Sequence, residues 1–121
     1  MADHNILGQK GEELAQQYFI DKGFEIRHLN WRHKKNEIDI IAEKNNLLVV
    51  VEVKTRSNDY FENPKEAVTR KKQKFIITAT EAYIIEFDVD LEVRFDIVSV
   101  LISNNKSEIE HIEDAFQPSL L

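Results

Sequence analysis

Two charged residues interrupt the most apolar stretch of the chain. Residues 47–54 read Leu-Leu-Val-Val-Val-Glu-Val-Lys, which predicts a central strand covered on both faces. Burying an unpaired charge is very costly, so Glu52 and Lys54 each need a partner or an ion. Because residues two apart on a strand point to the same face, the two side chains lie next to each other. A partly buried ion pair explains them as well as a binding site does.

A second acidic pair, Glu37 and Asp39, lies on the preceding strand, which the pattern predicts over residues 37–42. If a turn at Asn45-Asn46 pairs this strand with the next, Asp39 and Glu52 can meet. Two carboxylates brought together repel each other unless a cation lies between them. Mg²⁺ suits that position, with Mn²⁺ as the alternative, because it binds one or two carboxylates together with waters and phosphate oxygens.

A lysine beside such an ion has a chemical use. Lys54 can stabilise the charge of a phosphate, or help to orient or deprotonate the attacking water. The ion can activate that water and neutralise the leaving oxygen. The residue types and their spacing therefore indicate hydrolysis of phosphodiesters at a nuclease-type site.

Two further polar residues are predicted at the flanks of this site. Glu12 lies at the edge of the apolar face of a helix expected over about residues 5–22, where it can join Asp39 and Glu52. Gln73 has the comparable position on a second helix, where it can hydrogen-bond a water or a phosphate. For each of them, an ordinary exposed helix residue is the alternative interpretation.

The remaining pattern predicts the elements that position these residues. Gly23 ends the first helix, and a strand is expected over about 24–30. Asn63-Pro64 begins a helix of roughly 20 residues, and strands follow at 93–102 and 107–112. This order predicts an α/β fold with a mixed central sheet flanked by helices, formed by one domain over residues 1–121. The buried side of the second helix is expected to consist of Val68, Phe75, Ile76, Ala79 and Tyr83.

The composition limits where the protein works and what it binds. No cysteine is present and no apolar run suits a signal peptide or membrane span, so we expect a cytoplasmic protein without membrane contact. The net charge of −6 counts against a free-standing nucleic-acid binder. The positive charges are clustered, however, at residues 32–35 and 70–74, although a solvated helix face also explains the second run. We therefore expect weak affinity alone, or a protein partner.

Several short motifs are distributed along nearly the whole chain. They are Gly8-x-x-Gly11-Glu12, Asn30-Trp31-Arg32, Glu37-Ile38-Asp39, Glu52-Val53-Lys54-Thr55-Arg56, Lys71-x-Gln73, Arg94-Phe95-Asp96, His111-Ile112 and Ala115-Phe116. Together they resemble the YraN-like family of small uncharacterised bacterial proteins. That family is similar in pattern to the PD-(D/E)XK nuclease superfamily, and to archaeal Holliday-junction resolvases in particular. The proline of the superfamily's name has no counterpart, because Ile38 precedes Asp39.

The resemblance implies a restriction-endonuclease-like αβββαβ core, in agreement with the element order. It makes Glu12, Asp39 and Glu52 the acidic metal site and Lys54 the catalytic lysine, and it places Gln73 on a helix that often supplies an extra site residue. The expected function is that of a metal-dependent endonuclease acting on nucleic acid, with DNA favoured over RNA and branched or damaged DNA as candidate substrates. The alternative is a non-catalytic nucleic-acid-binding or adaptor module with the same fold. A homodimer that spans two sites on its substrate is a further hypothesis.

Overall fold

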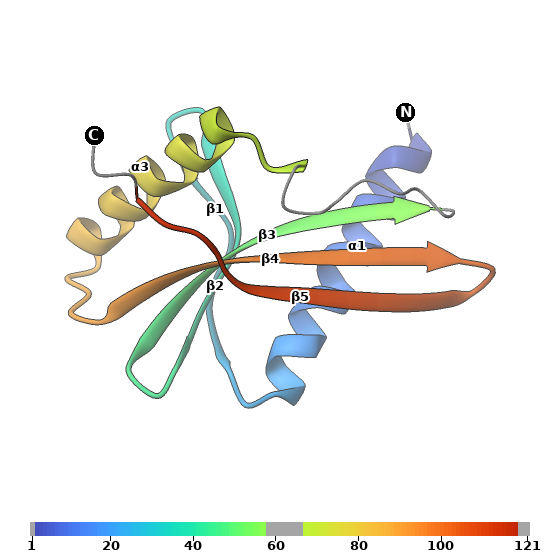
Figure 1. The fold of residues 1–121 in the computed structure, drawn as a ribbon, viewed down its shortest axis with the longest axis horizontal. Coiled ribbons are helices and arrows are strands. Elements are labelled where there is room, and N and C mark those ends of the chain that lie inside the picture. Colours follow the sequence, from blue (N-terminus) through green and yellow to red (C-terminus); the bar gives the residue numbers. More distant parts are fainter. Residues whose placement is uncertain (1, 58–66, 119–121) are drawn as a thin grey trace.

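The elements of a computed structural model, which describes residues 2–57 and 67–118, follow the predicted order (Figure 1). They form one five-stranded sheet in the order β1-β2-β3-β4-β5, in which β3 and β4 are parallel and the other neighbours antiparallel. The sheet is therefore mixed, as expected. The elements are α1 (Ala2–Asp21), β1 (Glu25–His33), β2 (Asn36–Lys44), β3 (Leu47–Ser57), α3 (Arg70–Glu86), β4 (Glu92–Ser103) and β5 (Lys106–Phe116).

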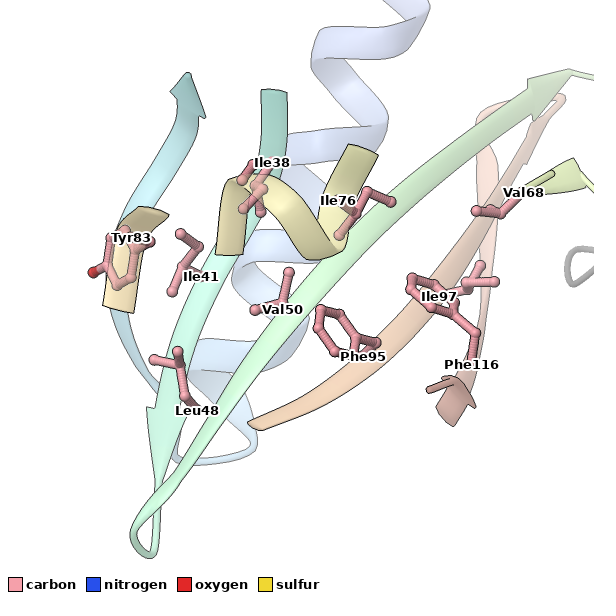
Figure 2. Packing of buried hydrophobic residues seen from close by; sticks show 11 residues of the cluster. Ile38, Ile41, Leu48, Val50, Val68, Ile76, Tyr83, Phe95, Ile97 and Phe116 are labelled. Atoms are coloured by element: carbon pink, nitrogen blue, oxygen red, sulfur yellow. The ribbon is translucent and has the colours of Figure 1, made fainter. Parts of the chain in front are cut away.

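The two helices cover opposite faces of this sheet. Ala15 and Phe19 of α1 pack on one face, against residues that include Val49 and Val51. Ile76 and Tyr83 of α3 pack on the other, in the cluster shown in Figure 2. The continuous apolar run of β3 is explained by this arrangement, because its side chains are buried alternately beneath α1 and beneath α3. Neither helix is long and apolar enough to cross a bilayer.

The turns form where the sequence predicts them. Asn45 and Asn46 join β2 to β3 with φ angles of 51° and 64°. This left-handed backbone matches the twist of a two-residue hairpin, and asparagine tolerates it better than most residues. Gly23, with φ of 90°, follows the end of α1 and also fits the prediction.

The second helix differs from its prediction in two ways. The described helix begins at Arg70, because the Thr69 side chain caps it by accepting a hydrogen bond from the Lys72 amide. The predicted start at Asn63-Pro64 lies outside the described residues. Val68 is buried as expected, but it precedes α3. The prediction for Phe75 was wrong: its side chain is 42% exposed, because the face that points to the sheet is set by residues 76, 79, 80 and 83.

The first helix approaches β3 closely at one point. A Cβ atom at Gly11 would collide with the side chain of Thr55, so only glycine allows this contact. The neighbouring Glu12 is thereby held near the sheet, half-buried, while Glu13 is exposed. The close packing of α1 on β3 is thus one of the features that position a proposed site residue.

A buried polar cluster fastens β5 to β4 on the α1 side. Asp96 is fully buried and receives hydrogen bonds from Arg94 at 2.9 Å and from the Asp114 amide at 3.0 Å. His111 Nε2 lies 2.6 Å from the same carboxylate, and its Nδ1 lies 3.0 Å from the Tyr18 hydroxyl. These contacts satisfy the carboxylate and link α1 to the edge of the sheet.

Candidate functional site

The candidate site lies where two neighbouring strands separate. Pairing between β2 and β3 ends at Ile40 and Val51, and from there β3 continues alongside β4 alone. Figure 2 shows the two strands diverging from their shared turn. At the point of separation, Asp39 Oδ2 accepts a hydrogen bond of 2.8 Å from the backbone N–H of Val53. The carboxylate therefore replaces the strand partner that this amide has lost.

The alternation of β2 changes at the same place. Ile38 and Ile41 both pack beneath α3, whereas Ile40 and Ala42 pack beneath α1. A regular strand would place residues 38 and 40 on one face. The irregularity falls at Asp39, which is half-buried between the separating strands.

Asp39 and Glu52 are brought together, as the sequence analysis expected. Their carboxyl groups lie within hydrogen-bonding reach of each other. Burial, and then the charge of Asp39, raise the pKa of Glu52 to about 8. Burial also raises the pKa of Asp39, although the Val53 amide opposes this shift. Two carboxyl groups that are close together and have raised pKa values form a location where a cation can take the place of a proton.

Two lysines face the buried Glu52. Its side chain is only 6% exposed, and both Lys54 Nζ and Lys72 Nζ lie 3.8 Å from its Oε2 atom. These separations are longer than the hydrogen bonds of a tight ion pair, so the contacts are loose. The predicted ion pair between Glu52 and Lys54 is therefore present, but only as a loose contact.

Lys72 was not among the residues predicted at the site from the sequence. It was counted with the run at residues 70–74, for which a solvated helix face was one interpretation. The available signal was its position three residues after a capping threonine, Thr69, which places it in the first turn of α3. That turn faces the site, because Ile76, one turn further on, packs with Ile38.

Glu12 lies on the other side of the separating strands. It lines an open cleft of about 330 Å³ together with Asp39, Asn30 and Leu29. With its amide nitrogen turned towards the carboxylates, Asn30 donates to Glu12 Oε1 at 2.7 Å and to Glu37 Oε1 at 3.1 Å. Burial, and then the charges of Asp39 and Glu37, raise the pKa of Glu12.

Asn30 is a second residue that the sequence analysis missed as part of the site. It stands in the middle of β1 with φ of 51°, a conformation that asparagine adopts more readily than most residues. The available signal was weak, because the strand predicted over about 24–30 ended at Asn30, and asparagine is common where strands end.

The predicted metal ligands fit a divalent cation in part. Asp39 and Glu52 provide the two carboxylates that Mg²⁺ and Mn²⁺ commonly take, with waters completing the coordination. Within residues 2–57 and 67–118, however, no three Asp, Glu or His side chains are close enough together to hold a metal ion. Glu12 as a direct ligand therefore stays a prediction, and the donor set that the geometry offers is the pair Asp39 and Glu52.

Gln73 contacts the backbone that precedes α3. Its Nε2 atom donates a hydrogen bond of 3.1 Å to the carbonyl oxygen of Val68. This bond uses one of the two hydrogens of the amide nitrogen and does not involve Oε1. The role of Gln73 in a site stays a prediction.

Basic side chains surround the start of α3 and the hairpin between β1 and β2. Figure 1 shows this hairpin and the first turn of α3 towards the same end of the molecule. Near the carboxylate pair, such charges can attract a phosphate backbone despite the net charge of the chain. The exposed residues are Arg32, Lys34 and Lys35 on the hairpin, and Arg70, Lys71 and Lys74 on α3.

Comparison with known proteins gives a consistent result along the chain. The model of the uncharacterised protein family UPF0102 matches residues 11–100. A protein of this family from Phocaeicola vulgatus is 53% identical over 120 residues, which cover 99% of each chain. A second family member, from Bacteroides thetaiotaomicron, is 49% identical to this chain, and the alignment again covers 99% of each chain. A third, from Christiangramia forsetii, is 47% identical over 96% of this chain and 98% of the relative. The resemblance to small uncharacterised bacterial proteins is thereby confirmed.

Proposed function

This chain belongs to the uncharacterised protein family UPF0102, and we propose that it is a metal-dependent nuclease whose site is centred on Asp39 and Glu52. The observation that carries the proposal is the position of these two carboxyl groups. They meet in a partly buried place where β2 and β3 separate, and a lysine follows two residues later on the same strand. This combination of groups suits hydrolysis of a phosphodiester.

The ligands of the proposed metal are Asp39 and Glu52, with Glu12 as a candidate third. A Mg²⁺ or Mn²⁺ ion bound there would activate a water and neutralise charge on the phosphate. Asp39 is held by the Val53 amide, which uses one lone pair of Oδ2, and the carboxylate has further lone pairs that can bind a ligand. The carboxylate is therefore positioned before any ligand arrives, which reduces the entropic cost of binding.

Lys54 has the role of the catalytic lysine in this proposal. Its side chain is 33% exposed, so the ammonium group can reach both the buried Glu52 and a phosphate arriving from solvent. A positive charge at this position stabilises the negative charge that develops on the phosphate in the transition state. It can also orient the attacking water.

The substrate we propose is nucleic acid, with DNA favoured over RNA. The exposed basic residues of the β1–β2 hairpin and of the start of α3 supply contacts to the phosphate backbone. The mixed sheet with a helix on each face is compatible with the αβββαβ core of the PD-(D/E)XK nucleases. Membership of that superfamily is part of the proposal.

A cleavage assay tests this function. The intact protein is incubated with duplex, branched, single-stranded and damaged DNA and with structured RNA, in Mg²⁺ or Mn²⁺. We expect cleavage of at least one substrate, which EDTA abolishes, and a loss of rate of about 100-fold or more in Lys54→Met and Glu52→Gln. Cleavage that persists in both variants, or no cleavage of any substrate, would count against the proposal.

A second candidate is a non-catalytic nucleic-acid-binding module. It is favoured over the nuclease by the finding that no three acidic or histidine side chains gather closely within the described part of the chain. It predicts binding that weakens with salt and does not change with metal or with Glu52→Gln. A binding titration with and without Mg²⁺ therefore separates the two functions.

A further inference from the structure

The buried Glu52 has two cationic partners that come from different elements. Lys54 is placed by the strand itself, because residues two apart share a face. Lys72 comes from α3, and its ammonium group lies just as near, 3.8 Å from Oε2. The geometry of strand β3 accounts for the position of Lys54 but not for that of Lys72, so the position of Lys72 needs a separate explanation.

The two lysines differ in their influence on the carboxyl groups. The positive charge of Lys72 lowers the pKa of both Asp39 and Glu52, and at Glu52 its effect is larger than that of Lys54. Its ammonium group lies beside Glu52 Oε2, next to the Asp39 carboxyl group. A shared cation is also what a metal ion would be at this place.

The backbone of Lys72 is fixed while its head group is free to move. Its amide donates to Thr69 Oγ1 at 3.2 Å, and Gln73 Nε2 ties the preceding turn to the Val68 carbonyl. The side chain is 40% exposed and its contact with Glu52 is loose, so moving the ammonium group into solvent costs little.

We infer that Lys72 is an internal counter-ion that occupies the metal position of the Asp39–Glu52 pair and has to withdraw when a divalent cation binds. This inference rests on the metal-binding pair of the proposed function. A cation bound to Glu52 at about 2.1 Å would be strongly repelled by an ammonium group that stayed beside the same oxygen. Once withdrawn, the Lys72 ammonium group points to the solvent at the start of α3. There it can form an ion pair with a phosphate of the substrate.

Calorimetric titration with Mn²⁺ tests the inference without any measurement of activity. The proteins are the unmodified chain, Lys72→Met, Lys72→Arg, and Lys74→Met as a control. Lys74 lies on the same helix, is exposed, and its substitution changes the net charge equally. We expect Lys72→Met to bind Mn²⁺ about threefold or more tightly, because the competing cation is gone, while Lys72→Arg and Lys74→Met stay near the unmodified affinity.

An unchanged or weaker affinity in Lys72→Met would overturn the inference, as would an equal gain in Lys74→Met. These outcomes leave the proposed function standing, provided that the unmodified chain binds Mn²⁺ and Asp39→Asn does not. If neither the unmodified chain nor Lys72→Met binds Mn²⁺, the metal pair itself is wrong, and the inference falls with it.

Discussion

The carboxylate of Asp39 accepts the backbone N–H of Val53 at 2.8 Å, just beyond the last paired residues of β2 and β3. One side chain thus does two things at once. It satisfies an amide that the separating strands have left without a partner, and it holds a carboxyl group against that of Glu52. The fold and the candidate site therefore depend on the same residue.

The close approach of α1 to β3 predicts opposite effects for two glycines. Gly11→Ala should lower the free energy of unfolding by about 1–3 kcal/mol, because the added Cβ collides with Thr55. Gly8→Ala is the matched control on the same helix, and a Cβ there meets nothing within 4 Å. It should be neutral or raise stability by about 0.5–1 kcal/mol, because alanine favours the helix. Urea denaturation measures both. Equal effects of the two substitutions would show that the close contact is not present.

The Asp96 cluster predicts how the protein responds to acid. Burial alone would raise the pKa of Asp96, but hydrogen bonds from His111, Arg94 and the Asp114 amide outweigh it and lower the pKa below 3.8. The ionised carboxylate therefore stabilises the fold fully above pH 3.8, and this stabilisation is lost as pH falls through the lowered pKa. Asp96→Asn should lower the free energy of unfolding at pH 7 by about 3 kcal/mol. When the pH falls below 4, this variant should then lose less stability than the unmodified protein does.

A neighbouring carboxylate serves as the control for Asp96. Glu113 also contacts Arg94, at 3.8 Å, but its side chain is 59% exposed. Glu113→Gln should change the free energy of unfolding by less than about 0.5 kcal/mol. Thermal melts at pH 7 and pH 3 compare the three proteins. A loss in Glu113→Gln equal to that in Asp96→Asn would contradict the importance assigned to the buried cluster.

Glu52 predicts the opposite dependence on pH in the absence of metal. Its pKa is raised from 4.5 to about 8 in the folded chain by burial and by Asp39. A raised pKa contributes stability that is fully present below 4.5 and is lost as pH rises through about 8. In EDTA, the unmodified protein should therefore lose stability between pH 6 and pH 9, and Glu52→Gln should lose less. Urea denaturation at the two pH values checks this, and equal losses in both proteins would count against a shared proton.

Much of the fold could be predicted from the sequence because local signals agreed with tertiary packing. The apolar run at residues 48–51 is buried on both faces, and the Asn45-Asn46 turn sets the pairing of β2 with β3. From these two features, the meeting of Asp39 and Glu52 could be expected. Phe75 was placed wrongly because the helix pattern fits more than one face, and the packing of α3 on the sheet selects among them.

Other features of the site depend on contacts that no local pattern contains. The break in alternation between Ile38 and Ile40 arises where β2 leaves β3, and the sequence there still alternates. Lys72 reaches Glu52 only because of how α3 lies across the sheet. The hydrogen bond from the Gln73 amide to the Val68 carbonyl likewise depends on how the chain enters α3.

The most direct test of the account is whether Asp39 and Glu52 together bind a divalent cation. Calorimetric titration of the intact protein with Mn²⁺ should give saturable binding that is lost in Asp39→Asn and in Glu52→Gln. The asparagine can still accept the Val53 amide, so the fold is retained, as circular dichroism would verify. Glu43→Gln, on the same strand but paired with Arg27, should bind Mn²⁺ like the unmodified chain. Equal Mn²⁺ binding by all four proteins, or none by the unmodified one, would contradict the central claim.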